Sequence, residues 1–359
     1  MPEEYNLFQP DPQEKLAKCH VHNRKLFSSY YLAYKVPGKK VWQNLDDKAS
    51  EAFEAIKKAY SDMATTNLLS AKNEAETERV FIRPTLQALG FEHFSVQPTL
   101  DSYDAKLRPD YALFPNRESY ETAQRERENM RVFYGKAVAI AEAKYWGRPM
   151  NDPDPSDPAD PSDATKQLVG YLRDVAEWTD GKTRWGILTN GKLWRLFCRR
   201  ADYTAENYVE IDLEAIITED NFEAFKYFYA LFSREAFVLD PTEGISWLES
   251  YLKGSEEYSS AITRRLKDLI FEEIFDSLAE GFVRYRREKL GVTREDELSK
   301  RAIYQGCLTL LYRLLFFAQR REPPTAAFKQ PRISLEKPAG SHGTHLGGTR
   351  SASGPQPRF

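Results

Sequence analysis

The sequence is poor in cysteine and lacks a long apolar run. Its three cysteines, Cys19, Cys198 and Cys307, are far apart in 359 residues. They match neither a disulfide framework nor the paired spacing of a zinc site, and we expect a protein of the reducing cytoplasm. The apolar stretch 308–318 is too short and too charged to cross a membrane. The acidic N-terminus lacks the apolar segment of a signal peptide.

A strong excess of charge of either sign is also missing. The formal net charge is −3, so the chain as a whole does not attract nucleic acid electrostatically. Any contact with DNA must therefore come from a local basic patch or through metal ions. The chain is 41% hydrophobic and 29% charged, which is typical of globular proteins, and its length allows one large or two modest domains.

Apolar patterning and composition divide the chain into four regions. Residues 1–70 are predicted to form an N-terminal helical extension, and residues 71–216 alternate strand and helix signals. Residues 217–320 are predicted to be helical, and residues 321–359, rich in Gly, Pro and Ser, to be disordered. This order predicts an α/β (α+β) fold with a small central mixed sheet flanked by helices and a helical C-terminal region.

The secondary-structure signals within these regions are local. Helices are predicted over 50–64, over 73–91 with a bend or restart at Pro84, and over 164–179 with Asp163 as its N-cap. Strands are predicted over 94–100, 107–114 and 137–146, as a hairpin over 184–200 that turns at Asn190-Gly191, and as an edge strand over 208–213. The charged segment 115–136 is expected to be an exposed helical or loop excursion, and the Pro- and Asp-rich segment 151–163 a loop.

One strand carries charge where an apolar core is expected. In AVAIAEAKYW, residues 137–146, Glu142 and Lys144 are separated by Ala143 and therefore point to the same face. Asp110 lies in the strand predicted before it, directly after Pro109. Two carboxylates on adjacent strands repel, so they need a proton or a cation between them. Carboxylate oxygens suit Mg²⁺, and a lysine beside the metal can act on water or phosphate.

Taken alone, the Glu-x-Lys triplet also fits a solvated strand end with a surface ion pair. The ordered set of Pro109-Asp110, Glu142-Ala143-Lys144 and a following helix with Gln167 and Tyr171 is more specific. This set resembles the PD-(D/E)XK nuclease superfamily. Together with 73–91, 184–197 and 303–318, it is similar to the N-terminal nuclease region of type IIG restriction–modification enzymes, which continues into a helical connector and a methyltransferase.

The resemblance implies a restriction-endonuclease-like core and a Mg²⁺-dependent (or Mn²⁺-dependent) DNA endonuclease of a restriction or phage-defence system. It implies that Asp110, Glu142 and the Ala143 carbonyl hold the metal and that Lys144 positions or activates water. An early acid completes the set. Glu74 fits this role best and Glu78 is the alternative. Gln167 is implied to orient the substrate or the lysine.

Aromatic and basic residues near these motifs have two interpretations. Tyr145, Trp146 and Arg148 follow the charged strand and either contact nucleic acid or pack at the sheet edge. Lys192 and Arg195 give the hairpin a basic character. They either contact DNA phosphates or form an ordinary solvated face.

The chain also departs from the type IIG pattern. It has no glycine-rich cofactor loop and no N-P-P-Y or D-P-P-Y motif, so we expect no S-adenosylmethionine site. The expected partners are double-stranded DNA and either a separate methyltransferase or specificity subunit or a second copy of the chain, with no membrane. The alternative function is a non-catalytic DNA-docking or assembly subunit that works with a separate methyltransferase.

Overall fold

The computed structural model describes residues 10–70, 72–96, 108–153, 163–200, 204–241, 243–294 and 296–319. The chain divides into unit 1, Met1–Lys267, and unit 2, Asp268–Phe359. The predicted boundary between 216 and 217 lies inside unit 1, because side chains on both sides of it belong to one apolar core. The expected disorder of 321–359, most of the loop 151–163 and the end of the strand 94–100 lie outside the described residues.

Unit 1 is built on a seven-stranded mixed sheet with the order β1-β7-β6-β5-β4-β3-β2. Only β4 and β5 pair in parallel, and all other neighbours are antiparallel. The predicted mixed α/β fold is thereby confirmed. The strands are β1 Val21–Arg24, β2 Phe94–Val96, β3 Tyr111–Leu113, β4 Ala139–Ala143, β5 Trp185–Thr189, β6 Leu193–Cys198 and β7 Tyr208–Asp212.

Two predictions about the sheet were wrong. The N-terminal region is not purely helical, because Val21–Arg24 forms the edge strand β1. This strand pairs with β7, so the segment predicted as an edge strand lies inside the sheet, between β1 and β6. The pairing joins segments that are far apart in the sequence, which a local pattern does not reveal.

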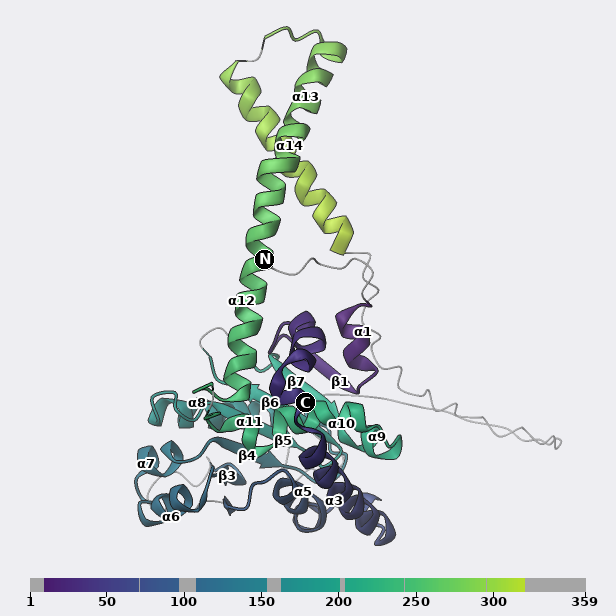
Figure 1. Ribbon diagram of the computed structural model, residues 1–359. Coiled ribbons are helices and arrows are strands. Elements are labelled where there is room, and N and C mark those ends of the chain that lie inside the picture. Colours follow the sequence, from purple (N-terminus) through teal and green to yellow (C-terminus); the bar gives the residue numbers. More distant parts are fainter. Residues whose placement is uncertain are drawn as a thin grey trace, which may run out of the picture. The chain divides into compact units, whose positions relative to one another are not determined.

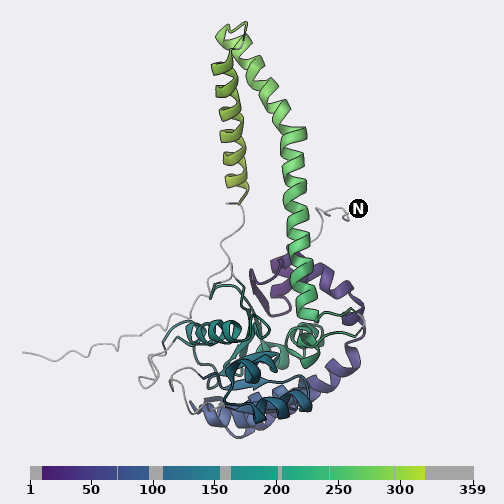
Figure 2. The same ribbon diagram turned by 90° about the vertical axis from the view of Figure 1, so that its left-hand side faces the viewer.

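Helices cover both faces of the sheet (Figures 1 and 2). Helices α3, α5, α9 and α10 contribute to the larger core on one face, and α6, α7 and α8 to a second core on the other. The helices of unit 1 are α1 Pro12–Ala17, η1 Tyr31–Lys35, η2 Val36–Gly38, α2 Lys40–Gln43, α3 Asp46–Thr65, η3 Leu68–Ser70, α4 Glu74–Thr77, η4 Glu78–Ile82, α5 Arg83–Ala88, α6 Arg117–Arg125, α7 Met130–Gly135, α8 Ala164–Trp178, α9 Leu213–Thr218, α10 Phe222–Phe232, α11 Arg234–Phe237 and α12 Trp247–Asp268, whose last residue belongs to unit 2.

The helix predicted over 73–91 is interrupted as Pro84 requires. A π-helical segment, η4, precedes α5, and Pro84 stands in the first turn of α5, where a missing N–H is tolerated. Helix α8 begins after Asp163, whose carboxylate accepts a hydrogen bond from the Lys166 N–H, as predicted. Glycine at 186 lets α8 lie close to β5, since an added Cβ would be 3.1 Å from Leu172.

The hairpin of β5 and β6 turns one residue later than predicted. The Asn190 N–H donates to the Leu193 carbonyl, so Gly191 and Lys192 are the central residues of the turn. Gly191 has a φ of +79°, a conformation that glycine adopts without the strain that a Cβ imposes. The Asn190 side chain instead donates to the Arg148 carbonyl and accepts from the Leu193 N–H.

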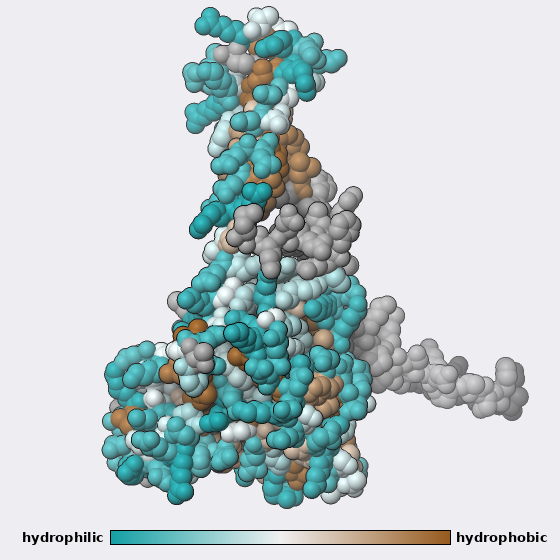
Figure 3. Space-filling view, in the orientation of Figure 1, coloured by the Kyte–Doolittle hydropathy of each residue, from teal (hydrophilic) through white to brown (hydrophobic). Residues whose placement is uncertain are grey.

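Unit 2 consists of helices in its described part, which confirms the predicted helical C-terminal region. It contains η5 Leu269–Ile274, α13 Phe275–Leu290 and α14 Glu297–Gln319. Phe275 and Tyr304 bring α13 and α14 into contact. Apolar side chains such as Leu298 and Tyr312 remain exposed, and brown areas on these helices are visible in Figure 3. No helix among the described residues has the length and apolarity needed to span a membrane.

Candidate functional site

The register of β3 and β4 brings two acidic residues together. Tyr111 pairs with Ala141 and Ala112 with Ile140 in antiparallel register. Continued by one residue, the same register places Asp110, directly before β3, opposite Glu142 of β4, with both side chains on one face. The Asp110 Oδ2 accepts a hydrogen bond of 2.8 Å from the Ala143 N–H. The backbone of β4 thereby fixes the Asp110 carboxylate beside Glu142.

Glu142 and Lys144 lie on the same face, as the alternation along β4 predicts. The Lys144 Nζ donates to Glu142 Oε1 at 2.8 Å, and their side chains are only 5% and 2% exposed. Within the described part of the chain, Glu142 Oε2 is buried without a hydrogen-bond partner. A solvated surface pair is therefore not what the structure contains. The pair is enclosed, and no donor in the described part of the chain reaches the second Glu142 oxygen, although a retained proton joins Glu142 to Asp110.

Burial and mutual repulsion make these acids weak. Burial, together with the nearby Asp110 charge, raises the pKa of Glu142 to about 8, although Lys144 opposes the shift. Burial also raises the pKa of Asp110, while the Ala143 N–H acts in the opposite direction. Burial disfavours the Lys144 ammonium, but the charges of Glu142 and Glu74 outweigh it and raise the pKa of Lys144. Without a bound cation, the two carboxyl groups therefore retain a proton at neutral pH.

Glu74 and Glu78 both act electrostatically on the site, and Glu78 in addition has hydrogen-bond partners of its own. Glu74 begins α4, next to the capping residue Asn73. Burial raises the pKa of Glu74 to about 7, with Lys144 opposing the shift and Asp110 adding to it. The Glu78 carboxylate instead accepts hydrogen bonds from the Tyr111 hydroxyl and from Arg83. Glu74 therefore keeps its carboxylate for the site, whereas that of Glu78 joins its helix to β3.

Helix α8 adds two polar side chains on the same face of the sheet. The Gln167 Nε2 donates to the Tyr171 hydroxyl at 2.9 Å, across one helical turn. Burial raises the pKa of Tyr171, and the charges of Glu142, Lys144 and Asp110 also act on it. The phenol therefore lies within electrostatic range of the carboxylates, and Gln167 is one hydrogen bond away from it.

The oxygen ligands at this site suit Mg²⁺, which keeps part of its water shell, better than a metal that is surrounded by protein ligands alone. No group of three or more His, Cys, Asp and Glu side chains in the described ranges is placed to hold a metal ion. Asp110 and Glu142 supply two carboxylates, and Glu142 Oε2 is unsatisfied. Because the Ala143 N–H is directed toward Asp110, its carbonyl leaves β4 on the same edge. Mg²⁺ takes one or two carboxylates and completes its shell with water and phosphate.

The residues predicted to contact nucleic acid after β4 are buried. Trp146 packs against Phe81 and Tyr60, and Tyr145 is also buried. The Arg148 side chain is 1% exposed, and its charge lowers the pKa of Glu74. These placements favour the packing alternative for Tyr145 and Trp146, and they place Arg148 beside the candidate site.

The two basic hairpin residues are also engaged within the protein. Lys192 Nζ is 2.6 Å from Glu214 and remains partly exposed. Arg195 is buried, with its Nε 2.6 Å from Glu210 Oε2. Its Nη1 donates to the Asn151 and Thr165 side chains. For Arg195, the structure favours neither of the two predicted interpretations, because it is neither solvated nor open to DNA.

The sequence analysis did not predict a lateral row of paired residues that runs across neighbouring strands of the sheet. Glu142 pairs with Leu188, Leu188 with Arg195, and Arg195 with Glu210. Paired residues share a face, so this row connects the carboxylates with the Arg195–Glu210 ion pair. The only sequence signal was the presence of Arg195 and Glu210 in otherwise apolar strands. The partners of a buried charge depend on strand order, which local patterns do not give.

Comparisons of the chain with protein-family models, with curated proteins and with solved structures each gave no match.

Proposed function

We propose that unit 1 is a Mg²⁺-dependent DNA endonuclease that hydrolyses phosphodiester bonds. The observation that carries the proposal is the buried juxtaposition of Asp110, Glu142 and Lys144. Asp110 and Glu142 face each other across β3 and β4, and Lys144 lies 2.8 Å from Glu142. Two carboxyl groups that are buried beside a single ammonium are balanced by a further cation, which a purely structural strand end does not require.

Each residue has a defined task in this proposal. Asp110, Glu142 and the Ala143 carbonyl hold the ion. Mg²⁺ (or Mn²⁺), when bound, lowers the pKa of water and neutralises charge on the scissile phosphate. Lys144 holds Glu142 in place and offers its ammonium to the attacking water or to the phosphate. Glu74 accepts a proton near Lys144, because its pKa of about 7 allows it to exchange protons at neutral pH. Gln167 acts through Tyr171, as a positioning residue.

The proposed substrate is duplex DNA, in the setting of restriction or phage defence and in the cytoplasm. One such site cuts one strand, so cutting both requires a second copy of the chain or a second encounter. A separate methyltransferase or specificity subunit remains a proposed partner. Because the net charge of the chain is −3, the DNA phosphates must be attracted by the metal and by local cations.

The test compares two substitutions that preserve size. Asp110→Asn retains an oxygen for the Ala143 N–H but removes a metal ligand. Lys144→Met retains the aliphatic stem and removes the ammonium. Plasmid nicking with Mg²⁺ should fall about 10³-fold in both. Mn²⁺ binding, followed by electron paramagnetic resonance, should be lost in Asp110→Asn and kept in Lys144→Met. Asp174→Asn on α8, outside the site, is the matched control and should behave like the wild type.

Two outcomes would contradict the proposal. Nicking that persists unchanged in Asp110→Asn and Lys144→Met would place the reaction elsewhere. A wild-type chain that binds DNA, but neither binds Mn²⁺ nor nicks with Mg²⁺, would favour the non-catalytic docking subunit instead.

A further inference from the structure

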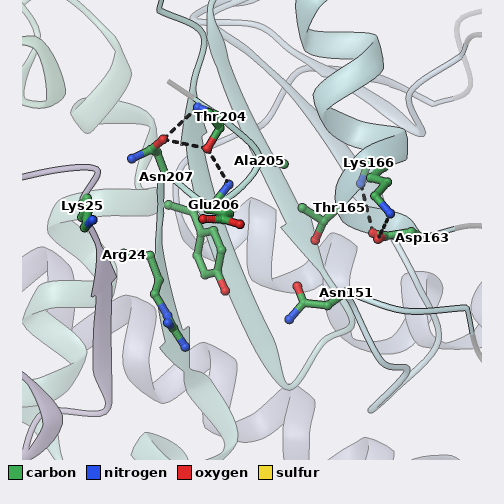
Figure 4. Close-up of a pocket in the computed structure, with 11 residues that line it drawn as sticks. Arg24, Lys25, Asn151, Asp163, Thr165, Lys166, Thr204, Ala205, Glu206 and Asn207 are labelled. Carbon is green, nitrogen blue, oxygen red and sulfur yellow. Dashed lines mark hydrogen bonds and ion pairs between the residues drawn. The ribbon is translucent and has the colours of Figure 1, made fainter. Parts of the chain in front are cut away.

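A polar cavity of about 730 Å³ lies on unit 1, away from the carboxylates. Figure 4 shows Arg24 and Lys25 on one side of it, Asp163 and Lys166 on the other, and the segment from Thr204 to Asn207 between them. These residues come from β1, from the start of α8 and from the segment before β7. With Asn151 from the segment after β4, the cavity is formed by four parts of the chain, and its volume is in the range of small-ligand sites.

Two of the cations at the cavity are unneutralised. Within the described residues, the side chains of Arg24 and Lys25 form no ion pair and no hydrogen bond. Lys166 pairs with Asp163, so among the described lining residues Arg24 and Lys25 share the cavity with one further carboxylate, that of Glu206. Lys25 has a φ of +60° and forms an isolated bridge with Tyr208. This left-handed backbone is unfavourable for lysine, and tertiary contacts must hold it.

The cavity is also lined by polar groups that Arg195 holds in place from below. The Arg195 Nη1 donates to Asn151 Oδ1, which orients the Asn151 amide so that its N–H groups remain available as donors. The Arg195 guanidinium also lies over the Tyr208 ring, at 4.5 Å. Tyr208 lines the cavity and is 8% exposed. Its hydroxyl has no hydrogen-bond partner in the described part of the chain. A hydroxyl in this position can donate to a ligand.

The sheet links the cavity with the carboxylates. Arg195 lies two strands from Glu142 in the lateral row, which is about 10 Å at the usual strand spacing. Helix α8 contributes Thr165 and Lys166 to the cavity and Tyr171 to the surroundings of the carboxylates. A nucleic-acid strand advances about 3.4 Å per nucleotide. A strand that passes over the carboxylates therefore reaches Arg195, which contacts the cavity residues Asn151 and Tyr208, within a few nucleotides.

We propose that this cavity binds a phosphate group of the nucleic-acid strand on which the carboxylate site acts. Arg24 and Lys25 supply the charge, and the Asn151 amide and the Tyr208 hydroxyl supply hydrogen-bond donors. Such contacts fix the position of a strand without reading its sequence. The inference rests on the proposed function for the identity of the strand, whereas the anion preference of the cavity follows from its own residues.

The test measures binding of a fluorescent DNA duplex in EDTA, where metal-dependent cleavage does not occur, as a function of salt. Arg24→Ala/Lys25→Ala should weaken binding about tenfold and reduce the slope of log K against log salt by about 0.9. The control is Lys58→Ala/Lys136→Ala, which removes two exposed lysines elsewhere on unit 1 and the same net charge. It should leave the affinity and the slope near the wild-type values. Circular dichroism checks that both variants are folded.

The outcomes separate this inference from the proposed function. Equal affinities for the two double variants, or equal losses, would overturn the cavity proposal even if plasmid nicking with Mg²⁺ is intact. Specific loss in Arg24→Ala/Lys25→Ala would support it even if the wild type never nicks DNA. A deoxynucleoside monophosphate that saturates the cavity without displacing the duplex would assign it to a free nucleotide, and would also overturn the proposal.

Discussion

Two buried charged groups lie in one lateral row of the sheet, and their surroundings differ. On β6 and β7, Arg195 meets Glu210 and also donates to Asn151 and Thr165. On β3 and β4, Asp110 and Glu142 compete for the single ammonium of Lys144, and Glu142 Oε2 has no partner among the described residues. The first group is compensated by the protein itself, and the second is not.

The difference separates a structural role from a functional one. A buried charge is tolerated when an opposite charge and hydrogen bonds replace its lost water. Arg195 and Glu210 meet this condition without a ligand. The carboxylates meet it only with a proton or a cation between them, which accords with the raised pKa values of both acids. Equal chemical changes at the two groups should therefore have different effects.

The largest effect is expected from glutamine at each end of the row. Glu142→Gln removes a metal ligand and should reduce Mg²⁺-dependent nicking about 10³-fold and abolish Mn²⁺ binding. Glu210→Gln leaves the Arg195 charge without its carboxylate and should lower the free energy of unfolding by about 3 kcal/mol. Nicking and Mn²⁺ titrations measure the first effect, and urea unfolding the second. The contrast fails if Glu210→Gln impairs Mn²⁺ binding while Glu142→Gln retains it.

The pH dependence of stability sharpens the same contrast. The pKa of Glu142 rises from 4.5 to about 8 on folding, and that of Glu74 to about 7. The folded state therefore binds more protons than the unfolded state between pH 4.5 and about pH 8. The stability gained from the neutral acids is complete below pH 4.5 and is lost as the pH rises toward 8. The metal-free protein should lose several kcal/mol over this window, because each unit of pKa shift corresponds to about 1.4 kcal/mol.

Urea unfolding in EDTA at a series of pH values measures this loss. Glu142→Gln cannot ionise and should flatten the curve, whereas Glu210→Gln should retain its slope. Mg²⁺ should restore stability at pH 8, because it binds the folded state. A metal-free wild type whose stability rises from pH 5 to pH 8 would contradict the electrostatic account of the site.

Local patterns were sufficient for the centre of the candidate site. Alternation along β4 predicted that Glu142 and Lys144 share a face, and the short apolar strand predicted before it supplied Asp110. Both results depend on the period of a strand and on the pairing of neighbours in sequence. The predicted cap at Asp163 and the restart at Pro84 were also correct, because a few adjacent residues determine them.

The surroundings of the site could not be predicted in the same way. Trp146 reads as an aromatic residue at a strand end, but it contacts Phe81, which lies 65 positions earlier. Edge strand β1 pairs with β7 from the other end of unit 1. The exposure of Trp146, and the partners of Arg195, follow from strand order and helix placement. These are tertiary properties, and they determine whether an aromatic or basic residue meets solvent, DNA or the core.

The smallest expected effect distinguishes the two early acids. Glu74→Gln removes a carboxylate that interacts electrostatically with Lys144, and nicking should fall about tenfold with little change in stability. Glu78→Gln weakens the contacts with Tyr111 and Arg83, so the free energy of unfolding should fall by about 1 kcal/mol. Its nicking rate should change less than that of Glu74→Gln. The reverse pattern, with the greater loss of nicking in Glu78→Gln, would move the early acid one helical turn along the chain.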